Sequence, residues 1–185
     1  LLQIVNQVPA ANEVAGDFGG VQSGSLTVVS SEELELAGNV IFPGSVSLSS
    51  SKDLTQTRNA VVAAGQLDLF SDSGSVGAEG SPIHIEIDSS SAINATSESG
   101  VYLSSEADFY VGQLIASDGP VELATAGDLY SGAGDGKIEG VNIALQVVNG
   151  GIGTQVEPLT IQTRASQLES GTVTDGLLTA AAADS

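Results

Sequence analysis

The sequence contains no cysteine, no methionine and no tryptophan among its 185 residues. Without cysteine there is no disulfide framework, and no thiolate is available to bind a metal. Aromatic residues make up only 4% of the chain, so the core has to be packed from small aliphatic side chains rather than large rings. No stretch approaches the roughly 18 continuous apolar residues of a transmembrane helix, and no membrane insertion is expected.

Positive charge is also scarce. Lysine and arginine number 4 against 23 aspartate and glutamate, which gives a formal net charge of −19. The four cations, Lys52, Arg58, Lys137 and Arg164, are scattered, whereas a nucleic-acid site needs a basic stripe to neutralise phosphates. No nucleic-acid partner is therefore expected, and binding to anionic membrane surfaces is disfavoured for the same reason.

What the chain does contain is 41% apolar residues and 23 glycines, which is too apolar a composition for a disordered tail. It opens on LLQIVNQ, with neither an initiator methionine nor a signal peptide. We therefore expect it to be a piece of a longer protein. Its acidity indicates tolerance of salt and divalent cations.

One phrase occurs twice: residues 74–85 are GSVGAEGSPIHI and residues 150–161 are GGIGTQVEPLTI. At this offset of 76, nine of 43 positions are identical between residues 67–109 and 143–185. At an offset of 75, GSVSLSSSKDL (44–54) matches GPVELATAGDL (119–129). The resulting division is a partial rung or connector over 1–23, a single rung over 24–43, one long repeat over 44–118 and a truncated second over 119–185.

A shorter repeat lies inside the long one. Strand starts led by glycine or proline recur every 16–22 residues, and the average is about 19, so four would make one long repeat. The starts alternate apolar and polar residues, as in SLTVV and IHIEI, which is typical of strands with one buried face. Their leading apolar residues are Leu26, Val46, Leu67, Ile83, Val101, Val121, Ile143, Leu159 and Leu177.

Hairpins of a sandwich would not need to keep one phrase at every fourth start. A chain that winds once per short repeat would, because equivalent residues then stack into a common core. The sequence therefore predicts an all-β parallel β-helix of eight or nine stacked rungs. Its corners are predicted at Gly44, Gly74, Gly77, Pro82, Gly100, Gly119, Gly150, Gly153, Pro158 and Gly176. Its inward residues should include Leu26, Val46, Leu48, Leu67, Leu69, Ile83, Ile85, Val121, Leu123, Leu145, Leu159 and Ile161.

A second recurring mark is an acidic residue followed by an apolar one, about eight or nine residues after the glycine of a strand start. It predicts a second short strand entered through a polar turn. The four instances are Glu33-Leu34, Asp53-Leu54, Asp108-Phe109 and Asp128-Leu129.

These repeats resemble those of very large bacterial surface exoproteins, namely filamentous-haemagglutinin-type adhesins and autotransporter passengers. The resemblance rests on GSVSLSSSKDL, GPVELATAGDL, GVYLSSEADFYVGQL and GGIGTQVEPLTI, and it covers roughly residues 20–185. It implies a right-handed parallel β-helix that forms a stalk outside the cell, within a parent protein that mediates adhesion or cell–cell contact. The secretion domain that normally heads such chains is not visible here.

Candidate catalytic residues are few. His84 is the only histidine, and strand alternation in IHIEI places it on the solvent face, opposite Ile83 and Ile85. Asp68 with Asp72, or Glu86 with Asp88, could be the carboxylate pair of a glycosidase. Because such sites also need cations or aromatic platforms, solvated surface acids are the favoured interpretation, and no catalytic residue is assigned.

Candidate ligand and modification sites are weaker still. GAGDGKIEG (132–140) has the composition of a calcium-binding nonapeptide but occurs once, so Asp135 is interpreted as a turn residue and otherwise as a weak calcium ligand. The triplet from Asn94 to Thr96 has the form of a glycosylation sequon, which arises by chance in such chains. Four aromatic residues near strand ends are assigned to packing, or else to a small partner-binding patch: Tyr102, Phe109, Tyr110 and Tyr130.

The resulting functional hypothesis is a non-catalytic structural segment of an extracellular or cell-surface adhesin or filament, without a cofactor. The alternatives are a carbohydrate-active β-helix enzyme and a module that binds a glycan or surface receptor. Both ends, LLQIVNQV and LLTAAAADS, are apolar and lack a capping element. We therefore expect stacking on neighbouring repeats of the same longer chain, or end-to-end on other copies.

Overall fold

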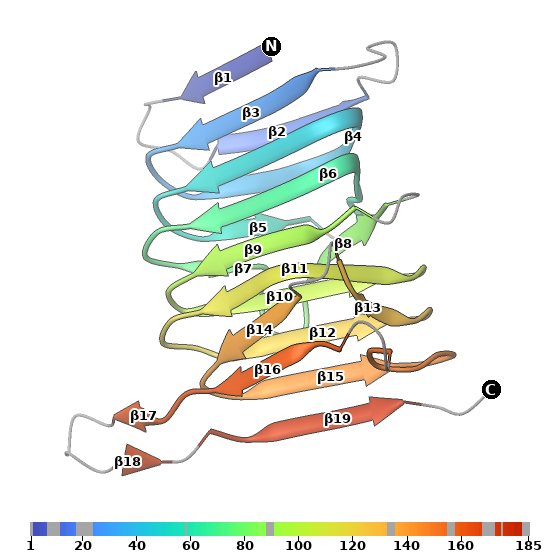
Figure 1. Ribbon diagram of the computed structural model, residues 1–185. Coiled ribbons are helices and arrows are strands. Elements are labelled where there is room, and N and C mark those ends of the chain that lie inside the picture. Colours follow the sequence, from blue (N-terminus) through green and yellow to red (C-terminus); the bar gives the residue numbers. More distant parts are fainter. Residues whose placement is uncertain are drawn as a thin grey trace.

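The described chain contains strands and no helix, and the strands wind into a parallel β-solenoid of about six turns (Figure 1). The computed structural model describes residues 2–6, 12–17, 24–57, 59–87, 91–132, 136–154, 158–167, 173–174 and 176–182. Strands β1 (Leu2–Asn6) and β19 (Leu178–Ala182) lie at opposite ends of the stack. The predicted all-β class and the stacking of parallel strands are confirmed.

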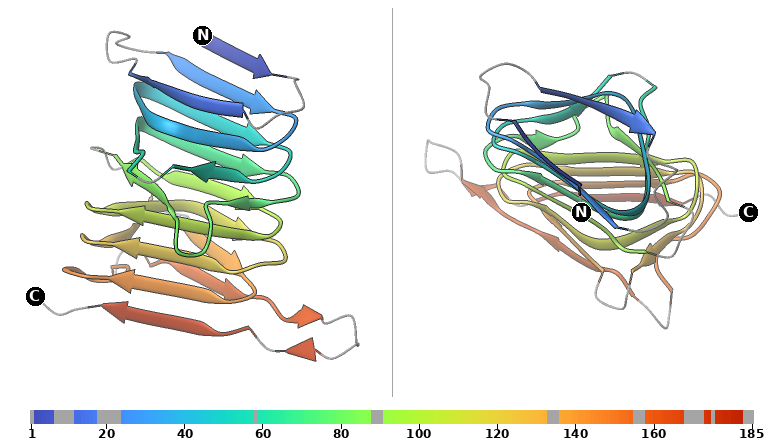
Figure 2. Two further views of the ribbon diagram at one scale, coloured as in Figure 1. Left: turned by 180° about the vertical axis from the view of Figure 1, so that it is seen from behind. Right: turned by 90° about the horizontal axis from the view of Figure 1, so that it is seen from above.

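Strand pairings follow the solenoid axis in columns, which form faces A, B and C around a common interior (Figure 2). Face A is the longest column, and each of its strands pairs in parallel with the next. It consists of β1, β3 (Ser25–Ser30), the end of β4 (Leu34–Ser50), the end of β6 (Val62–Ser71), β9 (Ile93–Ser97), the end of β11 (Phe109–Ala116), β14 (Lys137–Gly140) and β16 (Thr160–Thr163).

Face B follows face A along the chain in every turn. It consists of the start of β2 (Asn12–Asp17), the start of β4, β5 (Leu54–Gln56), β7 (Ser75–Val76), β10 (Gly100–Ser105), β12 (Val121–Thr125), β15 (Ile143–Val147) and β19. In the upper turns face C consists of the end of β2, the middle of β4, the start of β6 and β8 (Ile83–Glu86).

The cross-section changes at β10. This strand pairs with β7 through its first residues and with β8 through its last, so it spans the width of both faces above it. From there on face C is formed by the start of β11, by β13 (Leu129–Ser131) and by a parallel bridge from Leu129 to Ile152. Strands β17 (Ser166–Gln167) and β18 (Val173–Thr174) form a separate antiparallel ribbon.

The predicted rung length is not confirmed. Along face A, Leu26 pairs with Val46, whereas Leu67 pairs with Ile93, so the length of chain in one turn varies. The segment from Leu67 to Ile83 does not complete a turn of the solenoid, because Leu67 lies on face A whereas Ile83 lies in β8 on face C. Strands on different faces begin with the same alternation of apolar and polar residues. Some steps between faces were therefore interpreted as whole rungs, and eight or nine rungs were predicted where the structure has about six turns.

The long repeat also does not stack upon itself. Val46 and Val121 occupy matching positions of the two copies, yet Val46 pairs on face A with Leu26 and Leu67, whereas Val121 pairs on face B with Val101. Because the length of chain per turn varies, a fixed offset in the sequence does not correspond to a whole number of turns. The expectation that equivalent residues of the two repeats lie above one another is therefore wrong.

The repeated phrase instead encodes one local turn, used on two faces. Gly77 donates its N–H to the carbonyl oxygen of Leu54 at 2.8 Å, and Gly153 donates to that of Leu129 at 2.7 Å. Both glycines have a positive φ, of 75° and 67°. Glycine adopts this conformation without steric cost, whereas any residue with a Cβ is strained in it. The recurrence of glycine at this place therefore follows from the backbone of the turn.

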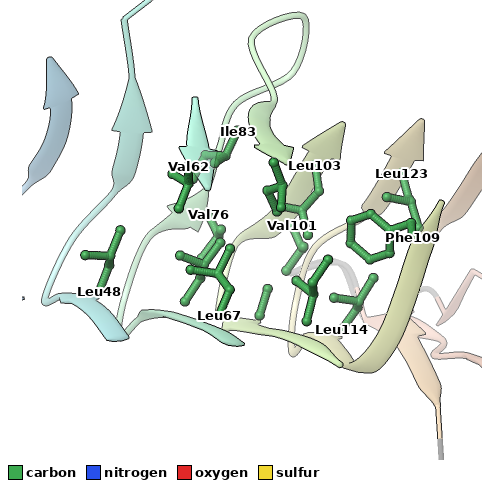
Figure 3. Close-up of a cluster of buried hydrophobic side chains, with 14 of the residues drawn as sticks. Leu48, Val62, Leu67, Val76, Ile83, Val101, Leu103, Phe109, Leu114 and Leu123 are labelled. Atoms are coloured by element: carbon green, nitrogen blue, oxygen red, sulfur yellow. The ribbon is translucent and has the colours of Figure 1, made fainter. Parts of the chain in front are cut away.

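A continuous aliphatic core runs between the faces (Figure 3). Ten of the twelve residues predicted to point inward are at most 3% exposed, and only Leu159 and Ile161 are half-buried, packed against the edge of the core. These two lie at and just before β16, which pairs with β14 on one side and with no described strand on the other. Phe109, assigned to packing, is fully buried.

Buried serines line the corner where face A ends, a feature that the sequence prediction missed. Ser50 and Ser71 both donate to the carbonyl oxygen of Lys52, at 2.7 and 2.6 Å. Ser97 donates to the carbonyl oxygen of Gly100 at 2.7 Å and accepts from the N–H of the same residue at 3.2 Å. These hydroxyls satisfy backbone groups that the sharp bend leaves unpaired.

The acidic mark has a structural role beyond its polar turn. The apolar residues that follow it begin β4, β5, β11 and β13, as predicted. Asp53 accepts the N–H of Ser75 at 2.8 Å, Asp108 that of Asp128 at 2.9 Å, and Asp128 that of Gly151 at 2.7 Å. Each carboxylate thus binds the backbone of the following turn and fixes the stacking register there.

The residues predicted as corners occupy several kinds of position. Gly44 lies inside β4, where the pairing register with β6 shifts. A Cβ on Gly119 would lie 1.7 Å from the carbonyl oxygen of Ser99, one turn away, so the backbones meet too closely for any side chain. Six others begin a strand, precede one by one or two residues, or lie against an aspartate of the preceding turn: Gly74, Pro82, Gly100, Gly150, Pro158 and Gly176. Gly77 and Gly153 are the positive-φ glycines of the shared turn described above.

Candidate functional site

A groove with a volume of about 420 Å³ lies on the outer surface of face B. We call it the Tyr102 groove. Its floor is the outer side of β10, β12, β15 and β19, and the loop from Ala78 to Pro82 forms a wall. Its lining includes Pro82, Tyr102, Glu122, Ala124, Ala144 and Gln146.

Strand register assembles the floor from residues far apart in the sequence. Tyr102 lies beside Glu122, Glu122 beside Ala144 and Ala144 beside Thr179, one strand after the next. Because side chains alternate along a strand, Leu103, Leu123 and Leu145 carry their side chains into the core while this row faces outward. Small alanines in the row and in the neighbouring one leave the sheet surface hollow.

The wall is a tight turn. Ala78 and Ser81 exchange backbone hydrogen bonds of 3.1 and 2.9 Å, which closes a short loop that projects over the sheet. Gly77 leads into it, and a Cβ there would lie 2.3 Å from the carbonyl oxygen of Tyr102. The loop therefore packs directly on the β10 backbone, which requires glycine at this position.

Gly100 positions the tyrosine ring. A Cβ on Gly100 would lie 2.8 Å from one ring carbon of Tyr102 and 3.2 Å from its hydroxyl oxygen. The ring thus lies over the glycine, which precedes it on the same side of the strand. Gly77 and Gly100, both predicted as corners, together place the aromatic element of the groove.

The charge of the groove is negative. Partial burial raises the pKa of the Tyr102 phenol, and the carboxylates of Glu122 and Glu79 raise it further. Glu79 lies in the wall loop, whereas Glu122 lies on the floor. The phenol therefore stays neutral at physiological pH.

The other two tyrosines form a separate pair on face C. The rings of Tyr110 and Tyr130 are neighbours in register, with centroids 5.2 Å apart and an interplanar angle of 32°. The Tyr130 hydroxyl donates to Asp128 at 2.8 Å, and this bond raises the pKa of Tyr130 to about 12. Hydrogen bonds from Gly151 and Tyr130 lower the pKa of Asp128. The three tyrosines are thus not one patch.

His84 lies on the outer surface of β8, as strand alternation predicted, and is half-buried. Its Nδ1 is 3.2 Å from the Ser104 hydroxyl, and its Nε2 is 3.8 Å from Glu86. Asp88, the proposed partner of Glu86, lies outside the described residues, as does Asp135. In the described ranges no group of three or more His, Asp or Glu side chains could hold a metal ion.

The remaining candidates have structural partners. Asp68 accepts a hydrogen bond from the Asn94 amide at 2.7 Å, and the Asn94 oxygen accepts the N–H of Gln113 at 2.9 Å. The amide of the sequon is therefore occupied within the sheet. Asp72 lines a separate open hollow beside Phe70 and is not brought to Asp68.

A buried carboxylate on face A was missed by the sequence prediction. Glu139 is only 5% exposed and forms ion pairs with Lys137 on its own strand and Arg164 from the next turn. The Lys137 ammonium, followed by the Arg164 guanidinium, lowers the pKa of Glu139. The sequence K-I-E-G (137–140) alternates like any other strand, and Arg164 lies a full turn later in the chain. The contact of Glu139 with both cations could therefore not be predicted without the strand register.

Comparison with known proteins gives no match to a family model, a curated protein or a solved structure. No helix long and apolar enough to cross a membrane occurs in the part of the chain that the structure describes.

Proposed function

We propose that the chain is a structural, non-catalytic segment of a large extracellular surface protein. The solenoid acts as a stiff spacer within an adhesin or filament that mediates attachment or cell–cell contact. The observation that carries this proposal is the continuous apolar core, with the turns held together by backbone pairing and, at three places, by the carboxylates of Asp53, Asp108 and Asp128. A stack of this kind resists extension along its axis, because elongation has to peel off whole turns.

Two further features belong to the proposal. The winding is right-handed, since crossovers between parallel strands are right-handed in about 98% of cases. The partners along the axis are neighbouring turns of a longer chain or another copy. This is supported by β19, whose residues are all exposed and which pairs with β15 alone among the described strands. The division into segments 1–23, 24–43, 44–118 and 119–185 stays a prediction.

Pulling on single molecules tests the spacer role. With the chain held at its two ends, we expect a sawtooth of force peaks as turns detach in sequence. Extension at low force without peaks would contradict the proposal. Substituting Gly119, where turns approach most closely, should lower the peaks, whereas substituting the exposed Phe70 should leave them unchanged.

A carbohydrate-active enzyme or glycan-binding module is the second candidate, favoured by the tyrosine and the glutamates in and beside the Tyr102 groove. Incubation with neutral and acidic polysaccharides, followed by analysis of reducing ends, decides between the two. Turnover that Glu122→Gln abolishes would establish the enzyme and overturn the non-catalytic assignment.

A further inference from the structure

The Tyr102 groove has the size of a binding site, since ligand pockets commonly measure about 300–1,000 Å³. Its volume of about 420 Å³ lies across four consecutive strands of face B. The structural role proposed above makes no use of it, because stacking of the turns depends on the inner side of the same strands. An aromatic ring, two acids and a floor of alanines therefore need a separate explanation.

No lysine or arginine among the described residues forms an ion pair with the acids of the groove. Lys52 is paired with Glu32, and Lys137 and Arg164 are both paired with Glu139 on another face. The lysines and the arginine of the described chain are thus bound elsewhere, and none forms an ion pair with Glu79 or Glu122. An occupant that brings its own positive charge would complement the groove, whereas phosphate, sulfate or uronate groups would be repelled.

The shape and chemistry of the floor indicate the rest of the occupant. Ala124 and Ala144 offer an apolar surface that suits the methylene stem of a long side chain. Tyr102, placed over Gly100, offers a ring, and a cation within about 6 Å of a ring centroid is attracted to it. Glu122 is next to Tyr102 in register, so one cation can contact both the ring and the carboxylate.

We propose that the Tyr102 groove is a docking site for a basic segment of another protein. A lysine or arginine of that segment lays its stem over Ala124 and Ala144 and places its cation between Tyr102, Glu122 and Glu79. This gives the spacer a lateral partner at a defined position along its axis. The proposal does not depend on the structural role proposed above. It rests only on the groove residues, so it would hold equally if the protein were an enzyme.

The test measures binding of an acetylated, amidated Ala-Lys-Ala-Lys-Ala peptide by NMR titration of the isotope-labelled chain. We expect amide shift changes concentrated on β10, β12 and the loop from Ala78 to Pro82. Glu122→Gln should weaken binding roughly fivefold, in line with the loss of one charge beside an aromatic cation site. Tyr102→Phe should bind as the unaltered chain does, and Tyr102→Ala should weaken binding by a similar factor.

The matched control is Glu98→Gln, which removes the same charge from an exposed site in the hollow beside Phe70. A chain of net charge −19 attracts any basic peptide weakly, so non-specific attraction has to be separated from docking. Equal effects of Glu122→Gln and Glu98→Gln, or shifts spread over all faces, would overturn the proposal. Binding of neutral oligosaccharides in the groove, without binding of the lysine peptide, would also overturn it in favour of a glycan site.

Discussion

Gly119 is the position where the stacking of turns can be tested most directly. A Cβ added there would lie 1.7 Å from the carbonyl oxygen and 2.3 Å from the carbonyl carbon of Ser99. Both contacts are with backbone, so no rotation of a side chain can relieve them. Gly119→Ala therefore has to move two turns apart at this corner. Gly151 is the control, because its added Cβ would meet only Asp128 Oδ1, at 3.9 Å.

The magnitude follows from the hydrogen bonds at the corner. The Val101 N–H donates to Pro120 at 2.9 Å, the Val121 N–H to Asn142 at 2.8 Å and the Val141 N–H to Gly119 at 2.9 Å. Each such bond contributes a net free energy of about 0.5–1.5 kcal/mol, so disrupting all three costs about 3 kcal/mol. Gly151→Ala meets no clash and reduces the entropy of the unfolded chain, which stabilises by about 0.4–1 kcal/mol where the conformation is allowed.

Urea denaturation followed by far-ultraviolet circular dichroism measures both variants. We expect the unfolding midpoint of Gly119→Ala to fall well below that of the unaltered chain and that of Gly151→Ala to stay level or rise. The slope of the transition should be checked in each case, because solenoids can unfold in segments. If Gly119→Ala unfolds at the same urea concentration as the unaltered chain, the close approach of the two turns is refuted.

Three further predictions concern the core, the ion pairs and the tyrosine pair. Phe109→Ala, at a fully buried site, should cost about 3–5 kcal/mol of unfolding free energy in the same assay, whereas Phe70→Ala, at a site 42% exposed, should cost under about 1 kcal/mol. The Glu139 ion pairs lower its pKa, so their stabilisation is present above the unfolded-state pKa of about 4.3 and is lost as the pH falls through the lowered value. Acid unfolding of Glu139→Gln should lack this component, and an unchanged acid profile would contradict the assignment. Ultraviolet titration should show one tyrosine ionising near pH 12, and Asp128→Asn should return that step toward about pH 10, because the acceptor of the Tyr130 hydroxyl loses its negative charge. In the unaltered chain alone, the folded state should lose the stabilisation from this bond as the pH rises from about 10 through about 12.

The sequence alone determined the fold class and most of the core. Alternation with a period of two identifies the buried side of a strand without knowledge of its neighbours, which is why Leu48, Leu69 and Leu123 were correctly predicted to be buried. Glycines at tight corners and the acidic mark before each second strand were equally visible, because turns depend on local backbone geometry. Gly77 and Gly153 occupy the same kind of turn, as their shared phrase indicated.

Which strands are neighbours was decided only by the tertiary structure. Every face accepts the same alternating pattern, so the sequence could not distinguish a step to the next face from a step to the next turn, and Ile83 was placed one turn below Leu67. The Tyr102 groove depends on the same information: Tyr102, Glu122 and Ala144 become neighbours only through the pairing register of β10, β12 and β15. Local patterns specify which way a side chain points, whereas contacts between turns are set by the length of chain that each turn consumes.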